Sequence, residues 1–224
     1  MSDFPFREDR HYLALDTSGP SGFVAVGRGG RSLARTRLER KGQHASRLVP
    51  AIHRVLEQAS VELAEVAGII VGECPGSFTG VRVAAATAKG MARALDIPLW
   101  AVSSLSAGAV GDLGQGGACV RYVLFAARGA RVYGGCYGVG SHGVETLLPP
   151  HAGDLRSLLA GDIPAGAVFA GEDPVAEVAT DVEDLAEEAG VDEVLQFAET
   201  GQPEFVLHDA VFDACGDGAL VQIE

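Results

Sequence analysis

The order of strand-like and helix-like segments over the first hundred residues is the feature that most restricts the fold. "HYLALDTS" is short, apolar and ended by turn-forming residues, and "GFVAVGRGGRSLARTRLE" predicts two antiparallel strands joined at Gly29 and Gly30. A segment with helical spacing follows, then the apolar run "VAGIIVGE", a second helical segment after "ECPGSFTG", and the strand-like "IPLWAVSS". The order of three strands, helix, strand, helix and strand predicts an α/β protein with helices packed on a mixed sheet.

The second half of the chain repeats the beginning of this pattern in a weaker form. After a connecting segment at 103–118, the stretches "CVRYVLFAA", "ARVYGGCYGV" and "GVETLLP" predict another three-stranded meander. The short apolar run "GAVFAGE" and the weak acidic helical pattern "PVAEVATDVEDLAEEAG" follow. We therefore predict two related β-meander-plus-helix halves, the second of them degraded.

The first helical segment, residues 43–59, has one apolar face. Its predicted buried positions are Ala45, Leu48, Val49, Ile52, Val55, Leu56 and Ala59. Because proline cannot donate a backbone hydrogen bond inside a helix, Pro50 predicts either a kink or a later helix start.

The second helical segment, residues 77–95, carries two stripes. One is a seam at spacings of three and four, formed by Phe78, Val81, Ala85, Ala88, Ala92 and Leu95. The other consists of the small residues Ala86, Gly90 and Ala94, which allow another backbone to approach closely. Both stripes can pack inside the protein, or the larger residues can face inward while the smaller ones meet a partner.

Composition and charge narrow the class of protein. The 47% hydrophobic fraction and 30 glycines indicate a well-packed globular protein, and four scattered cysteines without a CxxC pair support neither a zinc knuckle nor a disulfide framework. No apolar run reaches membrane-spanning length and the charged N-terminus lacks the apolar core of a signal peptide, so we expect a cytoplasmic protein without membrane contact.

The net charge of −13 is unevenly distributed. Residues 1–150 hold 16 Lys and Arg against 12 Asp and Glu, whereas residues 151–224 hold one basic residue, Arg156, against 18 acidic ones. The acidic end repels phosphate backbones. The basic run from Arg28 to Lys41 is more often a solvated strand edge than an anion site, and we favour the former interpretation.

The chemical motifs are individually weak. Asp16, Thr17 and Ser18 end the first predicted strand and have the composition of a phosphate-binding turn, but also of an ordinary hairpin turn. Ser77 lacks the spacing of a nucleophile elbow, and no Gly-Lys-Ser/Thr follows the glycines. A two-histidine metal site needs a second ligand four residues after His44, where Leu48 stands, so we predict no metal site.

Three longer stretches resemble the TsaB (YeaZ) family, the Gcp-like group related to glycoproteases. They are "LALDTS", "QHASRLVPAI" and above all "CPGSFTGVRVAAATAKGMARALDIPLWAVSSLSA". The resemblance implies an actin-like, sugar-kinase-type (ASKHA) fold, with an N-terminal subdomain at 1–105 and a divergent, acidic C-terminal subdomain at 106–224. It covers residues 11–110 well and the last seventy residues poorly.

The resemblance also implies a function. Such a protein would be the non-catalytic partner of the threonylcarbamoyltransferase TsaD in forming N6-threonylcarbamoyladenosine at position 37 of tRNAs that read ANN codons. The ATPase TsaE would join the complex, tRNA would be contacted only indirectly, and the chain would form a homodimer when TsaD is absent. No cofactor is expected, and a nucleotide only at the partner interface.

The partner surface implied by the resemblance lies on the helices at 43–59 and 77–95. Its helix-surface residues are Phe78, Val81, Arg82, Ala85, Ala86, Lys89, Gly90 and Ala94. Asp16, Thr17 and Ser18 would be a vestigial phosphate loop, and His44 the remnant of a His-x-x-x-His metal pair. Two alternatives stay open: an ATP-binding enzyme of the same fold, such as a phosphotransferase or a glycoprotease-like metallopeptidase, and a divergent, self-contained homodimer.

Two positions depart from the family pattern. The loop usually reads Gly-Pro-Gly-Ser-Phe-Thr-Gly, and Cys74 stands at its first glycine. A cysteine there is strained if the position has a positive φ and harmless if it does not. The usual Asp-Ala-Arg of the second half is replaced by Ala126, Ala127 and Arg128.

Overall fold

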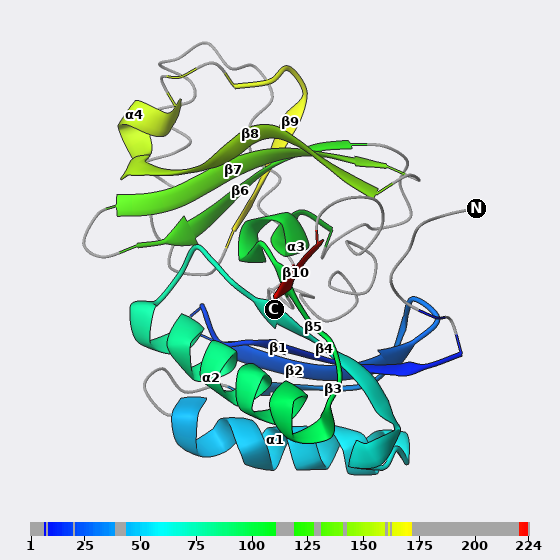
Figure 1. Ribbon diagram of the computed structural model, residues 1–224. Helices are drawn as coiled ribbons and strands as arrows, with labels where there is room; N and C mark the ends of the chain where they lie inside the picture. Colours follow the sequence, from blue (N-terminus) through cyan, green and yellow to red (C-terminus); the bar gives the residue numbers. More distant parts are fainter. Residues whose placement is uncertain are drawn as a thin grey trace.

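Two β-sheets, each with helices, form the two lobes of the protein (Figure 1). The computed structural model describes residues 7, 9–19, 21–38, 44–110, 119–127, 131–140, 143–159, 161, 163–171 and 220–223. The first lobe contains β1 (His11–Asp16), β2 (Gly22–Arg28), β3 (Arg31–Leu38), α1 (His44–Ala59), η1 (Leu63–Glu65), β4 (Val66–Gly72), α2 (Phe78–Leu95) and β5 (Leu99–Val102). The short helix α3 (Ser104–Val110) follows, then β6 (Cys119–Ala126), β7 (Arg131–Gly140), β8 (Gly143–Asp154), α4 (Leu155–Leu159), β9 (Ala167–Gly171) and β10 (Leu220–Ile223).

Sheet A has the strand order β10-β5-β4-β1-β2-β3. The predicted meander is present, since β1 to β3 are antiparallel neighbours and Gly29 and Gly30 turn the chain with φ of 58° and 73°. β4 and β5 add in parallel to β1, as expected for strands that follow helices. β10 pairs antiparallel with β5, so sheet A takes strands from both sides of the 105/106 boundary that the sequence predicts.

Sheet B, with the order β8-β7-β6-β9, repeats half of this arrangement. β6, β7 and β8 form an antiparallel meander and β9 pairs in parallel with β6, as β4 does with β1. The connecting helix is α1 in the first lobe, with 16 residues, and α4 in the second, with only 5. The prediction of two related halves with a degraded second one is therefore confirmed, whereas the predicted acidic helix at 174–190 lies outside the described residues.

The helices divide between the two faces of sheet A. α1 and α2 lie side by side on one face, below the sheet in Figure 1, and their core contains Leu13, Leu15, Val24 and Val26 from the strands. α3 lies between the lobes, where Ala107 packs on the other face of sheet A while Leu105 and Ala109 pack on sheet B. Among the described residues no helix is long and apolar enough to cross a membrane.

Two expectations for α1 are wrong in part. The helix starts at His44 and runs through Pro50, so the later start does not occur. Its buried apolar residues are Leu48, Ala51, Ile52, Val55 and Leu56. Ala45 is exposed and Val49 is 48% exposed, because the face that meets the sheet is rotated toward Ala51.

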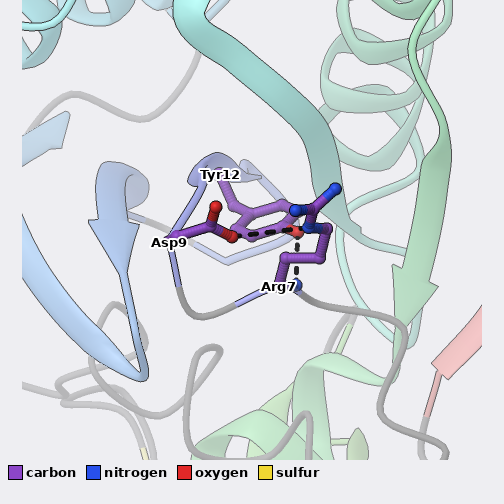
Figure 2. Close-up of polar contacts among 3 residues, drawn as sticks. All are labelled: Arg7, Asp9 and Tyr12. Atoms are coloured by element: carbon purple, nitrogen blue, oxygen red, sulfur yellow. Dashed lines mark hydrogen bonds and ion pairs between the residues drawn. The ribbon is translucent and has the colours of Figure 1, made fainter.

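The segment before β1 is attached to the sheet through Tyr12 (Figure 2). The backbone N–H of Arg7 donates to the Tyr12 hydroxyl over 2.8 Å, and the Arg7 guanidinium lies 3.4 Å from the Asp9 carboxylate on the surface. The Tyr12 ring is buried and packs edge-on against Trp100 at 6.1 Å. Its hydroxyl therefore has a partner at the edge of the core, as buried tyrosines require.

Candidate functional site

A buried carboxylate stands at the carboxyl end of the central strand β1. One oxygen of Asp16 accepts the Ser18 backbone N–H at 2.6 Å, and the other accepts the Ser104 hydroxyl at 2.7 Å. The Ser18 hydroxyl donates in turn to the Ser104 oxygen at 3.1 Å. Asp16, Ser18 and Ser104 are each 4% exposed or less. The predicted loop residues Asp16 and Ser18 are thus brought together with a serine that lies 88 positions away.

Ser104 was not among the site residues predicted from the sequence. Because β1, β4 and β5 are parallel, their carboxyl ends lie at one edge of sheet A, so the residue that begins α3 after β5 comes next to the end of β1. The sequence does contain a signal for this position, because Ser103 and Ser104 directly follow β5, a strand that the sequence pattern places in parallel with β1. Serines after strands are too common for their position alone to identify them as site residues.

Burial favours the protonated form of Asp16. It raises the pKa of the carboxyl above its usual 3.8, against the opposite effects of the hydrogen bonds from Ser18 and Ser104 and of the charge of His44. The neighbouring β4 backbone also approaches closely, since a Cβ at Gly72 would overlap the Asp16 carboxylate. Both oxygens of Asp16 therefore serve this chain's own loop and helix, which is a structural arrangement.

Substitutions at Asp16 distinguish the contribution of its hydrogen bonds to stability from the contribution of its charge. Asp16→Asn retains the acceptor for the Ser18 N–H and removes the charge, whereas Asp16→Ala leaves two buried donors without an acceptor at a cost of about 3 kcal/mol. Since the folded pKa is raised, wild-type stability is highest where Asp16 is protonated and declines as the pH rises from 3.8 through the folded pKa. Urea unfolding should therefore show Asp16→Asn gaining on the wild type as the pH rises toward neutrality; a gap that narrows with pH would contradict this assignment.

The glycine loop between β4 and α2 is hydrogen-bonded to the turn after β1. We call this contact, between residues 76–80 and residues 17–18, the clamp. The Ser77 N–H donates to the Ser18 carbonyl at 2.6 Å, and the Thr17 hydroxyl donates to the Gly80 carbonyl at 2.6 Å. A Cβ at Gly76 would lie 2.6 Å from the Ser18 carbonyl oxygen, and one at Gly80 would overlap the Thr17 carbonyl. The two glycines are therefore needed because backbone meets backbone here.

This clamp fixes where α2 begins. The Ser77 hydroxyl caps the helix by accepting the Gly80 N–H at 3.3 Å, and the helix ends at Asp96 in the left-handed conformation. The "PGSFTG" stretch thus holds the α2 start against Thr17 and Ser18, which are both buried.

Cys74 fits the loop without backbone strain. It is not among the residues with positive φ, which apart from glycines are Ser60 and Asp96 in the described chain. Its carbonyl accepts the Ser104 N–H at 3.0 Å, joining the loop to α3. Partial desolvation, and then the charges of Glu73 and Asp16, raise the pKa of the Cys74 thiol, which disfavours the nucleophilic thiolate.

His44 lies buried at the start of α1, beside the same turn. A Cβ at Gly22 would come within 3.1 Å of its Nδ1, and Leu48, one helical turn later, is fully buried in the core of the first lobe. Within the described parts of the chain, no three His, Cys, Asp or Glu side chains lie together as a metal-ligand group would.

The predicted partner surface lies on the outer side of α2. Of its eight residues Val81 and Ala85 are half-buried, and the other six, Phe78, Arg82, Ala86, Lys89, Gly90 and Ala94, are exposed. The face that packs inside the protein consists instead of Gly80, Ala84, Ala88 and Ala92. Of the seam found by spacing, Ala88 and Ala92 are therefore buried, whereas Phe78 is exposed.

Phe78 is the most exposed large apolar side chain among those described, at 70%. The Arg82 guanidinium lies over its ring, 3.7 Å from the centroid, one helical turn further along. Val49 on the adjacent helix α1 is 48% exposed. α1 and α2 lie side by side on one face of sheet A (Figure 1), and both helices carry exposed apolar or small residues.

Two lobes that each build a sheet on a β-meander, with a carboxylate at the end of the first strand, define the actin-like, sugar-kinase class of α/β proteins. A Listeria monocytogenes protein described as a candidate N-acetylmannosamine kinase shares this fold at a TM-score of 0.50 and 10% identity, over 91% of this chain and 98% of that one. YeaZ from Pseudomonas aeruginosa is more similar, with a TM-score of 0.65 and 32% identity over 72% of this chain and 76% of its own.

Sequence comparison narrows the class to a family. The model of the TsaD family, described as tRNA N6-adenosine threonylcarbamoyltransferase, matches residues 38–171. The tRNA threonylcarbamoyladenosine biosynthesis protein TsaB of Bacillus subtilis is 34% identical over 137 residues, which are 61% of this chain and 59% of that protein. The chain belongs to the TsaB (YeaZ) family, although its match spans less than two thirds of the length of that curated relative.

Proposed function

We propose that this chain is the non-catalytic partner of TsaD in the formation of N6-threonylcarbamoyladenosine at position 37 of tRNAs that read ANN codons. The relatives named TsaB support the pathway. The observation that carries the partner role is the exposed surface of α2, where Phe78 stands out next to a stripe of small residues. Small residues let a second helix approach closely, and an exposed aromatic residue supplies apolar area to bury.

The buried state of Asp16 supports a non-catalytic role for this chain. A carboxylate that holds Mg²⁺ or activates a nucleophile must reach the reacting group, whereas both oxygens of Asp16 are bonded to Ser18 and Ser104. The residues of the vestigial phosphate loop therefore stabilise the junction of β1, α2 and α3. Under this proposal the chemistry belongs to TsaD, TsaE joins the assembly, and a nucleotide binds only where the partner completes the site.

The enzyme alternative has a direct test. An ATP-dependent phosphotransferase of this fold would bind Mg-ATP without TsaD, and a metallopeptidase of this fold would bind a metal ion without TsaD. Calorimetry of the isolated protein with Mg-ATP distinguishes the enzyme from the non-catalytic partner. Micromolar binding with turnover would indicate an enzyme, whereas the partner role requires neither ATP binding nor turnover by this chain alone.

The size of the protein in solution tests the partner role. The isolated 23.1 kDa chain should form a dimer, because the apolar residues of α1 and α2 are exposed in a single chain. Light scattering with increasing TsaD should then show the homodimer replaced by a complex of the two proteins, since both would use the same surface. A dimer that persists unchanged in excess TsaD would instead support the self-contained homodimer.

A further inference from the structure

The hairpin of β2 and β3 carries a concentration of positive charge. Residues 21–38 contain Arg28, Arg31, Arg35 and Arg37 and no Asp or Glu, in a chain whose net charge is −13. All four arginines are exposed. The acidic residues that dominate the chain are concentrated beyond residue 150, so this hairpin differs sharply from the rest of the sequence.

The register of the hairpin places two of these arginines on a defined face of sheet A. Arg37 pairs directly with Phe23 and Arg35 with Ala25, and directly paired residues project to the same side of a sheet. Ala25 and Phe23 belong to the cluster that contains Tyr12, Trp100 and Ala107 of α3. Arg35 and Arg37 are therefore on the face of sheet A opposite to the one covered by α1 and α2. Figure 1 shows both helices on a single side of that sheet.

The arrangement suits a phosphate backbone. Arginines two positions apart on one strand are separated by about 6.6 Å, so they form a row of cations along the edge of the sheet. The Arg37 Nε–H donates to the Ser21 hydroxyl at 2.9 Å, which holds one of the five N–H donors of the guanidinium in place. The same guanidinium lies 6.0 Å from the centroid of the half-buried Phe23 ring. Arginines beside an aromatic ring are a combination found on RNA-binding surfaces.

We propose that Arg35 and Arg37, with Arg28 and Arg31 at the hairpin end, form an RNA-binding surface that contacts the backbone phosphates of tRNA. This inference rests on the proposed function, which supplies tRNA as the substrate of the complex. It departs from two expectations from the sequence, that the basic run is a solvated strand edge and that tRNA is contacted only indirectly. Because the arginine face and the α1–α2 face lie on opposite sides of sheet A, the chain can hold TsaD and tRNA at the same time.

The experiment measures binding of an unmodified tRNA transcript to the full chain, alone and in complex with TsaD, over a range of salt concentrations. Each lost phosphate contact reduces the slope of log K against log salt by about 0.7 to 0.9. The double variant Arg35→Gln/Arg37→Gln should lose about 1.4 to 1.8 of that slope and about tenfold in affinity. The charge-preserving variant Arg35→Lys/Arg37→Lys and the single variant Arg131→Gln on sheet B should retain most of both.

The outcomes separate this inference from the proposed function. If the glutamine variant binds tRNA with the wild-type slope and affinity, or if the wild type binds none at low salt, the RNA-binding surface is refuted. The same variants should still copurify with TsaD whatever the tRNA measurement gives, since the arginines lie away from α1 and α2. A wild-type chain that fails to copurify with TsaD would refute the partner role and leave the tRNA measurement on the chain alone intact.

Discussion

Gly80→Ala is expected to destabilise the fold by about 3 kcal/mol, although alanine is the better helix former. The added Cβ would overlap the Thr17 carbonyl oxygen and lie 2.9 Å from the carbonyl carbon. Both atoms are backbone, so relief requires moving the α2 start away from the turn after β1, which breaks the Thr17 to Gly80 hydrogen bond. Urea unfolding monitored by circular dichroism gives the change in the free energy of unfolding.

Gly90→Ala is the matched control for this prediction. It lies in the same helix, and a Cβ there meets no atom within 4 Å. Within a single chain the control should stabilise the fold by about 0.5–1 kcal/mol, because only helix propensity changes there. Opposite signs at the two glycines would support the clamp, whereas a stabilising effect of alanine at position 80 would show that the two loops are not in close backbone contact.

Ala86→Arg is expected to abolish copurification with TsaD while leaving the protein folded. Ala86 is exposed at the N-terminal end of the small-residue stripe, so an arginine there costs little in the free chain. In the complex its side chain would occupy the space in which a partner helix approaches, and burying its charge without a counter-ion would cost several kcal/mol. A pull-down with tagged TsaD measures the effect.

The control for Ala86→Arg is Glu145→Arg, at an exposed position on the edge strand β8 of the second lobe. It introduces the same bulky, positively charged side chain far along the chain from α2 and should retain the complex. Normal copurification of the Ala86→Arg variant, with circular dichroism confirming its fold, would place the TsaD interface elsewhere.

Local patterns were sufficient to predict most of the first lobe. Apolar alternation and the Gly29-Gly30 turn predict the meander, and helical spacing predicts α1 and α2 to within a residue at each end. These features depend on neighbours in sequence, and the fold preserves them. The side of each helix that faces the sheet was harder, because Val49 and Phe78 fit an apolar pattern and are nevertheless exposed.

The candidate site shows why the remainder could not be predicted. Asp16, Thr17 and Ser18 were recognisable as a strand-end turn, but their partners Gly80 and Ser104 lie 63 and 88 positions away. The function of the "GSFTG" glycines is equally non-local, since only the packed structure shows that the Gly80 Cβ position is taken by the Thr17 carbonyl. Contacts of this kind follow from the order of strands in sheet A, which no single segment encodes.

The central claim is that this chain supports threonylcarbamoylation of tRNA as a partner and without chemistry of its own. Its most direct test is the content of N6-threonylcarbamoyladenosine in tRNA from cells depleted of the protein and complemented with variants. The account predicts that depletion removes the modified nucleoside, that the wild type and Asp16→Asn restore it, and that Ala86→Arg does not. An unchanged content of the modified nucleoside after depletion, or its loss with Asp16→Asn in a folded protein that still binds TsaD, would contradict the claim.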